Sequence, residues 1–154
     1  MQYINGGGRI VAVDEHKSGE AFNGDTISSF RERTRANVKI EDGCNRFCSY
    51  CIIPYLRGRS RSRNPENVVA EIERLAPLEA VITGINLSAY DYQNIRLNGL
   101  IDRLYDINCR IRLGSLEVGV ITEEFLSSLK NLKNFAPHFH LSLQSGCDET
   151  LKRM

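Results

Sequence analysis

The sequence predicts an α/β protein with about four parallel strands and helices packed outside them. Short apolar runs that read as strands occur at residues 38–40, 80–83, 110–113 and 139–143. These runs start about 30 to 40 residues apart and alternate with helical stretches, as in βα units joined by right-handed crossovers. Four strands are too few to close a barrel, so we expect an open, curved sheet that forms part of one.

The first 36 residues differ in composition from the rest of the chain. They are rich in Gly, Ser, Thr and charged residues, and only residues 9–13 read as a short strand. We therefore interpret residues 1–36 as a linker and residues 37–154 as one α/β domain.

The predicted helices have recognisable starts. They lie at residues 65–75, 97–107, 122–132 and 148–154. Asn64 is placed to cap the first of them, with Pro65 at its first position. Thr122 is placed to cap the third, and Glu123 and Glu124 suit the positive end of its helix dipole.

Charge is segregated along the chain. The net charge is only +1, but residues 31–63 contain nine basic and three acidic residues and carry +6. A polyanionic partner near this segment is therefore plausible. No apolar run is long enough to span a bilayer, and the first residues lack the layout of a signal peptide, so we expect no membrane association and a cytoplasmic location.

Three of the five cysteines fall within eight residues, directly after the first predicted strand. Cys44, Cys48 and Cys51 have the spacing CxxxCxxC, and Gly43 lets the chain turn before them. Three thiolates can hold three irons of a [4Fe–4S] cube and leave the fourth iron open for a small ligand. The alternatives are a structural zinc site, for which no matching pair of histidines follows, and inert buried thiols.

The CxxxCxxC spacing is the hallmark of radical S-adenosylmethionine (SAM) enzymes. The segment SSFRERTRANVKIEDGCNRFCSYCIIPYLRGRSRSR at residues 28–63 resembles the tRNA methylthiotransferase family, and most of all its threonylcarbamoyladenosine branch. The similarity continues through ITGINLSAY (82–90), RLGSLE (112–117) and HLSLQSGCDETLKRM (140–154). This resemblance implies that the α/β domain is the amino-terminal part of a radical SAM barrel, truncated here.

The resemblance also implies cofactors and the residues that bind them. Cys44, Cys48 and Cys51 match the ligands of a [4Fe–4S] cluster whose open iron holds SAM, and an electron from the cluster cleaves SAM to a 5′-deoxyadenosyl radical. The expected SAM contacts are Tyr50 near the adenine, Gly84 and Asn86 at the methionine moiety, and Ser115, Glu117, Ser142 and Gln144 at the ribose or amino group. From the residues alone, a plain turn or polar side chains that satisfy loop amides explain these positions equally well.

Basic residues follow the cysteines at every second position. Arg57, Arg59, Arg61 and Arg63 match the RGxxxSR segment of the family and could contact phosphates of RNA or a cofactor carboxylate. A solvated basic loop is the alternative. Phe47, Tyr50 and Tyr55 interleave with the cysteines and this segment. They could stack on a flipped RNA base, and packing in the core is the alternative, favoured for at least one of them.

The function implied is that of a transferase that adds a methylthio group to N6-threonylcarbamoyladenosine next to the tRNA anticodon. Its partners would be tRNA and an electron donor such as flavodoxin or ferredoxin. We expect the chain to be a fragment, without the amino-terminal cluster domain, the rest of the barrel and the RNA-binding domain of the family, and so not fully active alone. The alternatives are relatives acting on isopentenyladenosine in tRNA or on a ribosomal-protein aspartate, and a noncatalytic metal-binding module that docks RNA.

Overall fold

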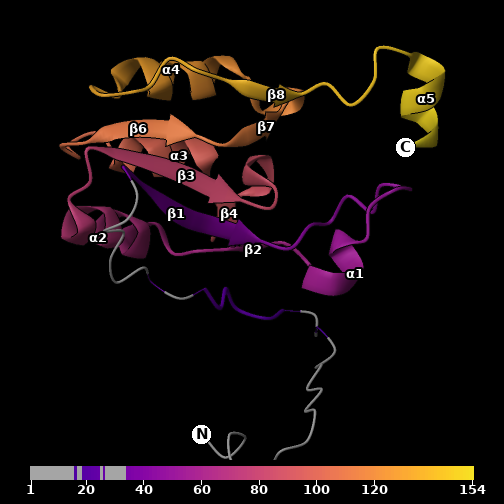
Figure 1. Ribbon diagram of the computed structural model, residues 1–154, viewed down its shortest axis with the longest axis horizontal. Helices are drawn as coiled ribbons and strands as arrows, with labels where there is room; N and C mark the ends of the chain where they lie inside the picture. The colour runs from indigo at the N-terminus through magenta and orange to yellow at the C-terminus, as the bar shows by residue number, and fades with distance from the viewer. Residues whose placement is uncertain (1–15, 17–18, 25, 27–33) are drawn as a thin grey trace, which may run out of the picture.

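The computed structural model describes residues 16, 19–24, 26 and 34–154, so the strand predicted at 9–13 lies outside the described residues. The elements form a layered α/β structure (Figure 1). The strands are β1 (Arg35–Asp42), β2 (Arg61–Ser62), β3 (Glu79–Gly84), β4 (Asp91–Tyr92), β5 (Ile95–Arg96), β6 (Arg110–Leu113), β7 (Ser115–Glu117) and β8 (His140–Ser142). The helices are α1 (Ile53–Arg57), α2 (Pro65–Leu75), α3 (Leu97–Arg103), α4 (Glu123–Asn131) and α5 (Asp148–Arg153), with 3₁₀ turns at Leu87–Ala89 and Val118–Val120.

The main sheet has the strand order β2-β1-β3-β6. β1, β3 and β6 are parallel, as predicted, and their carboxyl ends point toward the side of the molecule that carries α1 and α5 (Figure 1). The sheet also has one antiparallel edge strand that the sequence did not indicate, because β2 pairs antiparallel with β1. β2 has two residues within the basic segment, too short and too polar for an alternation pattern to reveal it.

The last predicted strand extends the parallel arrangement. β6 continues past Gly114 into β7, and β8 pairs parallel with β7, which places Ser115 opposite His140 and Glu117 opposite Ser142. Upstream of β8, the backbone amide of Ala136 donates to the carbonyl of Ile111 on β6 at 2.8 Å. β8 therefore occupies the next position across the curved sheet, and the predicted α/β half-barrel architecture is confirmed.

One face of the sheet packs against the helices. Alternate residues of the strands are buried, among them Val38, Ile40, Ala80, Ile82 and Ile111. These side chains form one continuous core with apolar residues of α2, α3 and α4. Because that alternation begins at Ala36, which is fully buried, the sheet includes two residues that the sequence placed in the linker.

The helix predictions hold for α2 and α4, whose starts have the expected caps. The Asn64 side chain accepts from the amide of Glu66 at 2.8 Å, and the Thr122 hydroxyl accepts from the amide of Phe125 at 3.2 Å. The helix predicted at 97–107 is shorter in the structure and ends at Arg103. The chain continues in tight turns that still bury Leu104 and Ile107, which explains why the apolar pattern read as helix to the end.

Gly43 allows the chain to leave β1 beside the returning basic segment. Its φ is +80°, and a Cβ atom there would lie 2.1 Å from the carbonyl oxygen of Arg59. The amide of the next residue, Cys44, donates to the carbonyl of Gly58 at 3.1 Å. Only glycine combines this backbone conformation with such a close approach, so Gly43 fixes where the cysteine segment begins.

We expect Gly43→Ala to lower the free energy of unfolding by more than about 1 kcal/mol, because it adds both an unfavourable φ and a backbone clash. Urea denaturation of the two proteins measures the difference. Gly119→Ala is the matched control, since no heavy atom lies within 4 Å of its added Cβ. Equal losses in the two variants would contradict this account of Gly43.

Candidate functional site

The three cysteines of the motif lie on the loop between β1 and α1, at the carboxyl ends of the parallel strands. Cys44, Cys48 and Cys51 are free thiols and partly exposed. The loop is held by its own backbone, because the amide of Cys51 donates to the carbonyl of Cys48 at 3.0 Å. A residue far along the sequence also binds the loop, since the amide of Ser49 donates to the carbonyl of Met154 at 2.8 Å.

All three thiols line one cavity of about 190 Å³. The sequence-predicted cofactor residues that share this cavity are Tyr50, Asn86, Ser115, Glu117, Ser142 and Gln144. They come from four different segments, each following or ending a parallel strand. The structure therefore brings together, at one edge of the sheet, nine of the ten residues predicted to hold the cluster and SAM.

Gly84 is the one residue of that set that does not line the cavity. It ends β3 against the buried side of β1, where an added Cβ would lie 3.0 Å from the backbone oxygen of Glu41 and 3.3 Å from its Oε2. Its place in the structure is thus close packing beneath the turn that carries Asn86.

Glu117 is the electrostatic centre of the cavity wall. Arg46 binds both of its carboxylate oxygens, through Nε to Oε1 at 3.0 Å and through its terminal nitrogen to Oε2. The Asn86 Nδ2 donates to the same Oε1 at 2.8 Å and lies 3.9 Å from the Cys44 sulfur. The hydrogen bond to Glu117 raises the pKa of Arg46, so the guanidinium stays charged.

Sequence reasoning missed Arg46, although it lies between two of the cysteines. Its partner is 71 residues away in the chain, so no local pattern reveals the pair. The one local signal is that a charged side chain stands inside the cysteine motif, directly at the predicted site.

Tyr50 and Gln144 close the cavity on the other side. The Tyr50 hydroxyl donates to Oε1 of Gln144 at 2.8 Å, joining the cysteine loop to the segment after β8. Gln144 adopts a φ of +65°, which a non-glycine residue adopts only where its surroundings hold it. Ser115 contacts Nδ1 of His140 at 2.7 Å across the β7–β8 pair.

Glu41 is a second residue that the sequence did not single out. It is fully buried at the end of β1, where its Oε1 accepts from the Ser60 hydroxyl at 2.8 Å and its Oε2 from the amide of Asn86 at 2.7 Å. Burial raises the pKa of this carboxyl. In the sequence, Glu41 simply follows the apolar run and reads as the polar face of a strand.

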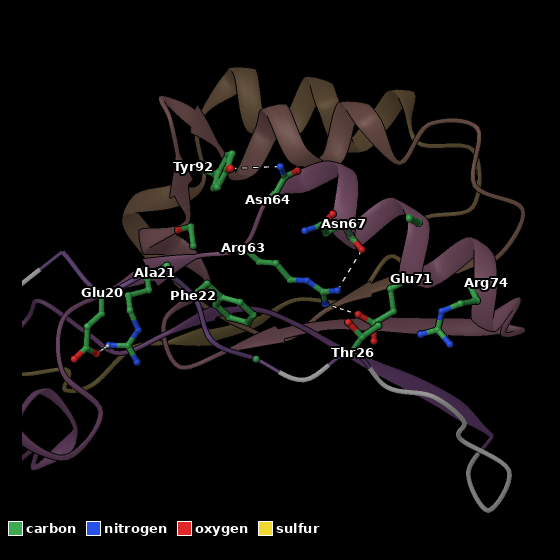
Figure 2. Close-up of a pocket in the computed structure, with 14 residues that line it drawn as sticks. Glu20, Ala21, Phe22, Thr26, Arg63, Asn64, Asn67, Glu71, Arg74 and Tyr92 are labelled. Carbon is green, nitrogen blue, oxygen red and sulfur yellow. Dashed lines mark hydrogen bonds and ion pairs between the residues drawn. The ribbon is translucent and has the colours of Figure 1, made fainter. Parts of the chain in front are cut away.

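The basic segment divides into an inner and an outer half. Arg61 and Arg63 have side chains only 10% and 7% exposed, whereas that of Arg57 is 53% exposed. Arg63 forms an ion pair with Glu71 of α2 and donates to the carbonyl of Asn67 at 3.2 Å (Figure 2).

Arg61 also has partners within the protein. It pairs with Asp42 at 3.3 Å, and it also donates to the carbonyl of Arg57 at 2.8 Å. Arg57 itself lies at 3.9 Å from Asp42, and Arg59 is exposed. Of the four arginines predicted to contact substrate, Arg57 and Arg59 are thus the two that face outward.

A larger cavity of about 640 Å³ lies beside this inner half, but its wall contains no cysteine. Figure 2 shows its polar side chains turned toward one another, with Asn64 donating to the hydroxyl of Tyr92 at 3.3 Å and Arg63 beside Glu71. The polar groups of this wall thus hold α2 against β2 and β4, and the thiol chemistry lies in the smaller cavity.

The donor set fits an iron–sulfur cube better than a single ion. Within residues 34–154 and the few described residues before them, no three His, Cys, Asp or Glu side chains converge on a point that could hold one metal ion. A zinc site needs its ligands around such a point. In a cube each thiolate binds its own iron, so the sulfurs surround a volume, as the three thiols of this cavity do.

The fold and the three-thiol cavity define a protein of the radical SAM class. The sequence profile of the Radical SAM superfamily matches residues 38–154, and the chain belongs to this superfamily. Within it, the chain is similar to threonylcarbamoyladenosine tRNA methylthiotransferases. It is 39% identical over 136 residues to the enzyme of Bacillus subtilis (strain 168) and 44% identical over 133 residues to that of Chlamydia pneumoniae.

These alignments cover 83% of this chain in both cases, and 30% and 32% of the relatives. The chain therefore spans about a third of the length of the relatives it matches. A structure of the radical S-adenosylmethionine methyltransferase TsrM from Kitasatospora setae, with tryptophan and a SAM analog bound, matches with a TM-score of 0.65 at 19% identity. That match covers 90% of this chain and 28% of the other, and it confirms the predicted radical SAM fold.

In the described part of the chain, no helix has the length and apolar character needed to cross a bilayer.

We expect Glu41→Gln to fold and to lose part of the pH dependence of stability. The raised pKa means that the folded chain binds this proton more tightly than the unfolded chain, so the stability it contributes is present at low pH. That contribution is lost as the pH rises from the usual range of a glutamate through the raised value. A glutamine can keep both hydrogen bonds, since Ser60 can accept as well as donate.

Urea denaturation at a series of pH values measures this effect, with Glu73→Gln at an exposed position of α2 as the control. An equally steep pH dependence in wild type and Glu41→Gln would contradict the assignment of the buried charge to Glu41.

We expect Arg63→Met to lower the free energy of unfolding by about 3 to 5 kcal/mol, because it leaves the charge of Glu71 buried without this partner. Arg57→Met, which removes an exposed arginine of the same segment, should cost less than about 1 kcal/mol. Thermal or urea unfolding distinguishes the two. Similar small losses in both variants would show that the Arg63–Glu71 ion pair does not stabilise the fold.

Proposed function

We propose that this chain belongs to a radical SAM enzyme that adds a methylthio group to N6-threonylcarbamoyladenosine next to the tRNA anticodon. The observation that carries the proposal is the cavity in which the thiols of Cys44, Cys48 and Cys51 lie together with polar groups from three later strand ends. A site with three thiolates and no fourth leaves one coordination position for a small ligand.

In this proposal Cys44, Cys48 and Cys51 hold a [4Fe–4S] cluster, with SAM beside it. Together these groups would supply the one-electron cleavage of SAM to methionine and 5′-deoxyadenosine, with the electron from the flavodoxin or ferredoxin and the hydrogen atom from the substrate. The chain's own residues bind and orient SAM. Glu117 accepts from the SAM amino group, and Asn86 and Arg46 fix the Glu117 carboxylate in place. Tyr50 and Gln144, joined by their hydrogen bond, cover the adenine side and limit the access of water.

The choice of substrate rests on the relatives. The aligned proteins of Bacillus subtilis and Chlamydia pneumoniae are both named threonylcarbamoyladenosine tRNA methylthiotransferases. The partners we propose are tRNA and a flavodoxin or ferredoxin that delivers the electron, in the cytoplasm. Arg57 and Arg59 supply exposed positive charge for the RNA. Arg61 and Arg63 act in this proposal by holding β2 in place.

We expect anaerobic reconstitution with iron and sulfide to give about four irons per chain, because three thiolates and one exchangeable ligand complete a cube. Cys48→Ala should lose this iron. Cys147→Ala, which removes an exposed thiol outside the motif, should retain it. Iron analysis gives the count, and electron paramagnetic resonance with and without SAM shows whether SAM reaches the open iron.

A SAM-dependent change of the signal, with release of 5′-deoxyadenosine on reduction, is the expected result. Stoichiometric zinc, or iron that Cys48→Ala retains, would instead favour the noncatalytic metal-binding module.

A further inference from the structure

Two aromatic rings and a guanidinium form a small cluster on the surface at the cysteine loop. The rings of Phe47 and Tyr55 meet edge to face, with centroids 5.6 Å apart and an interplanar angle of 86°. The guanidinium carbon of Arg59 lies 4.4 Å from the centroid of the Phe47 ring. We call these three residues the aromatic platform.

The platform is open to solvent. Phe47 is 39% and Tyr55 69% exposed. Ile52, which precedes α1, and Leu56, on α1, are also more than half exposed. The described residues thus place several large apolar side chains together on one short helix and the loop before it. An exposed apolar cluster of this kind marks a binding surface more often than a structural one.

The backbone holds the platform in an unfavourable conformation. Phe47 has a φ of +51°, in the left-handed region that bulky residues avoid. Its two chain neighbours, Arg46 and Cys48, both line the thiol cavity. This turn therefore points the cysteine motif into the cavity and fixes the Phe47 ring outside it, so that the ring is ordered before any ligand arrives.

The charge on the platform is positive and uncompensated within the described residues. Arg59 has no carboxylate within ion-pair distance there, and exposed Arg57 reaches only Asp42, at 3.9 Å. A second exposed pair of the same type, Lys133 over the ring of Tyr105, differs on this point because Lys133 also pairs with Asp106 at 3.2 Å. The platform thus combines flat rings with free positive charge, which suits a ligand that has flat rings and negative charge.

We propose that the aromatic platform binds an unpaired base of RNA by stacking, with Arg57 and Arg59 at its phosphates, beside the loop whose cysteines line the thiol cavity. Aromatic and guanidinium planes bind splayed bases in single-stranded RNA but find no open base in a duplex. The proposal rests on the proposed function in that RNA is the substrate class, and it adds a surface that would hold a loop base beside the reacting one.

The test uses the reconstituted chain and an anticodon stem-loop RNA with 2-aminopurine in the loop. Tyr55→Leu should raise the Kd about tenfold and abolish the fluorescence quenching that stacking causes, and Arg59→Gln should weaken binding and its salt dependence. The matched controls are Tyr105→Leu and Lys133→Gln, which alter the exposed pair formed by the residues that follow α3 and α4. These controls, and a blunt RNA duplex tested with Tyr55→Leu, should show no change from wild type.

Equal affinity of Tyr55→Leu and Tyr105→Leu for the stem-loop would overturn the proposal. So would a result in which Tyr55→Leu binds RNA normally but accepts electrons more slowly from an acidic flavoprotein, since the surface would then dock a protein. Release of 5′-deoxyadenosine by the wild-type chain is measured in parallel. If the wild type cleaves SAM and Tyr55→Leu binds RNA normally, the platform alone has failed; if the wild type does not cleave SAM, the proposed function has failed.

Discussion

The carboxylate of Glu41 lies fully buried where three segments of the site meet. It accepts from Ser60, on the segment that returns into β2, and from the backbone of Asn86, on the turn after β3. Both segments therefore take their positions relative to β1, whose next residues lead into the cysteine loop. A buried carboxylate with no such donors would be costly, so the polar ends of two loops must converge on it. The geometry of the cavity wall follows from that requirement.

Local chemistry along the chain predicts much of this fold. The caps at Asn64 and Thr122 indicate two helices, and short apolar runs indicate β1, β3 and β6, because these signals act within a few residues. β2, β4, β5 and β7 have two or three residues each, and their pairing depends on the partner strand rather than on their own sequence. For the same reason the sequence could not show that the sheet has an antiparallel edge.

The site is predictable to a similar depth. The cysteines and the polar residues at strand ends are recognisable, because a strand end and a thiol motif are local features. The pairing of Arg46 with Glu117 links residues 71 positions apart, and no pattern in either segment indicates it. The arginines of the basic segment share one spacing, yet Arg63 is buried and Arg57 exposed, since only the approach of α2 with Glu71 distinguishes them.

The hydrogen bond between Tyr50 and Gln144 joins residues 94 positions apart, and the amide of Ser49 donates to the carbonyl of Met154. Contacts of such high sequence separation form late, because loop closure must come first. On the ribosome, the cysteine loop therefore emerges before these two partners, which follow only after about a hundred further residues are made. During that interval its thiols are accessible both to iron–sulfur delivery and to oxidants. The exposure of these thiols therefore depends on how much of the later chain has folded against the loop.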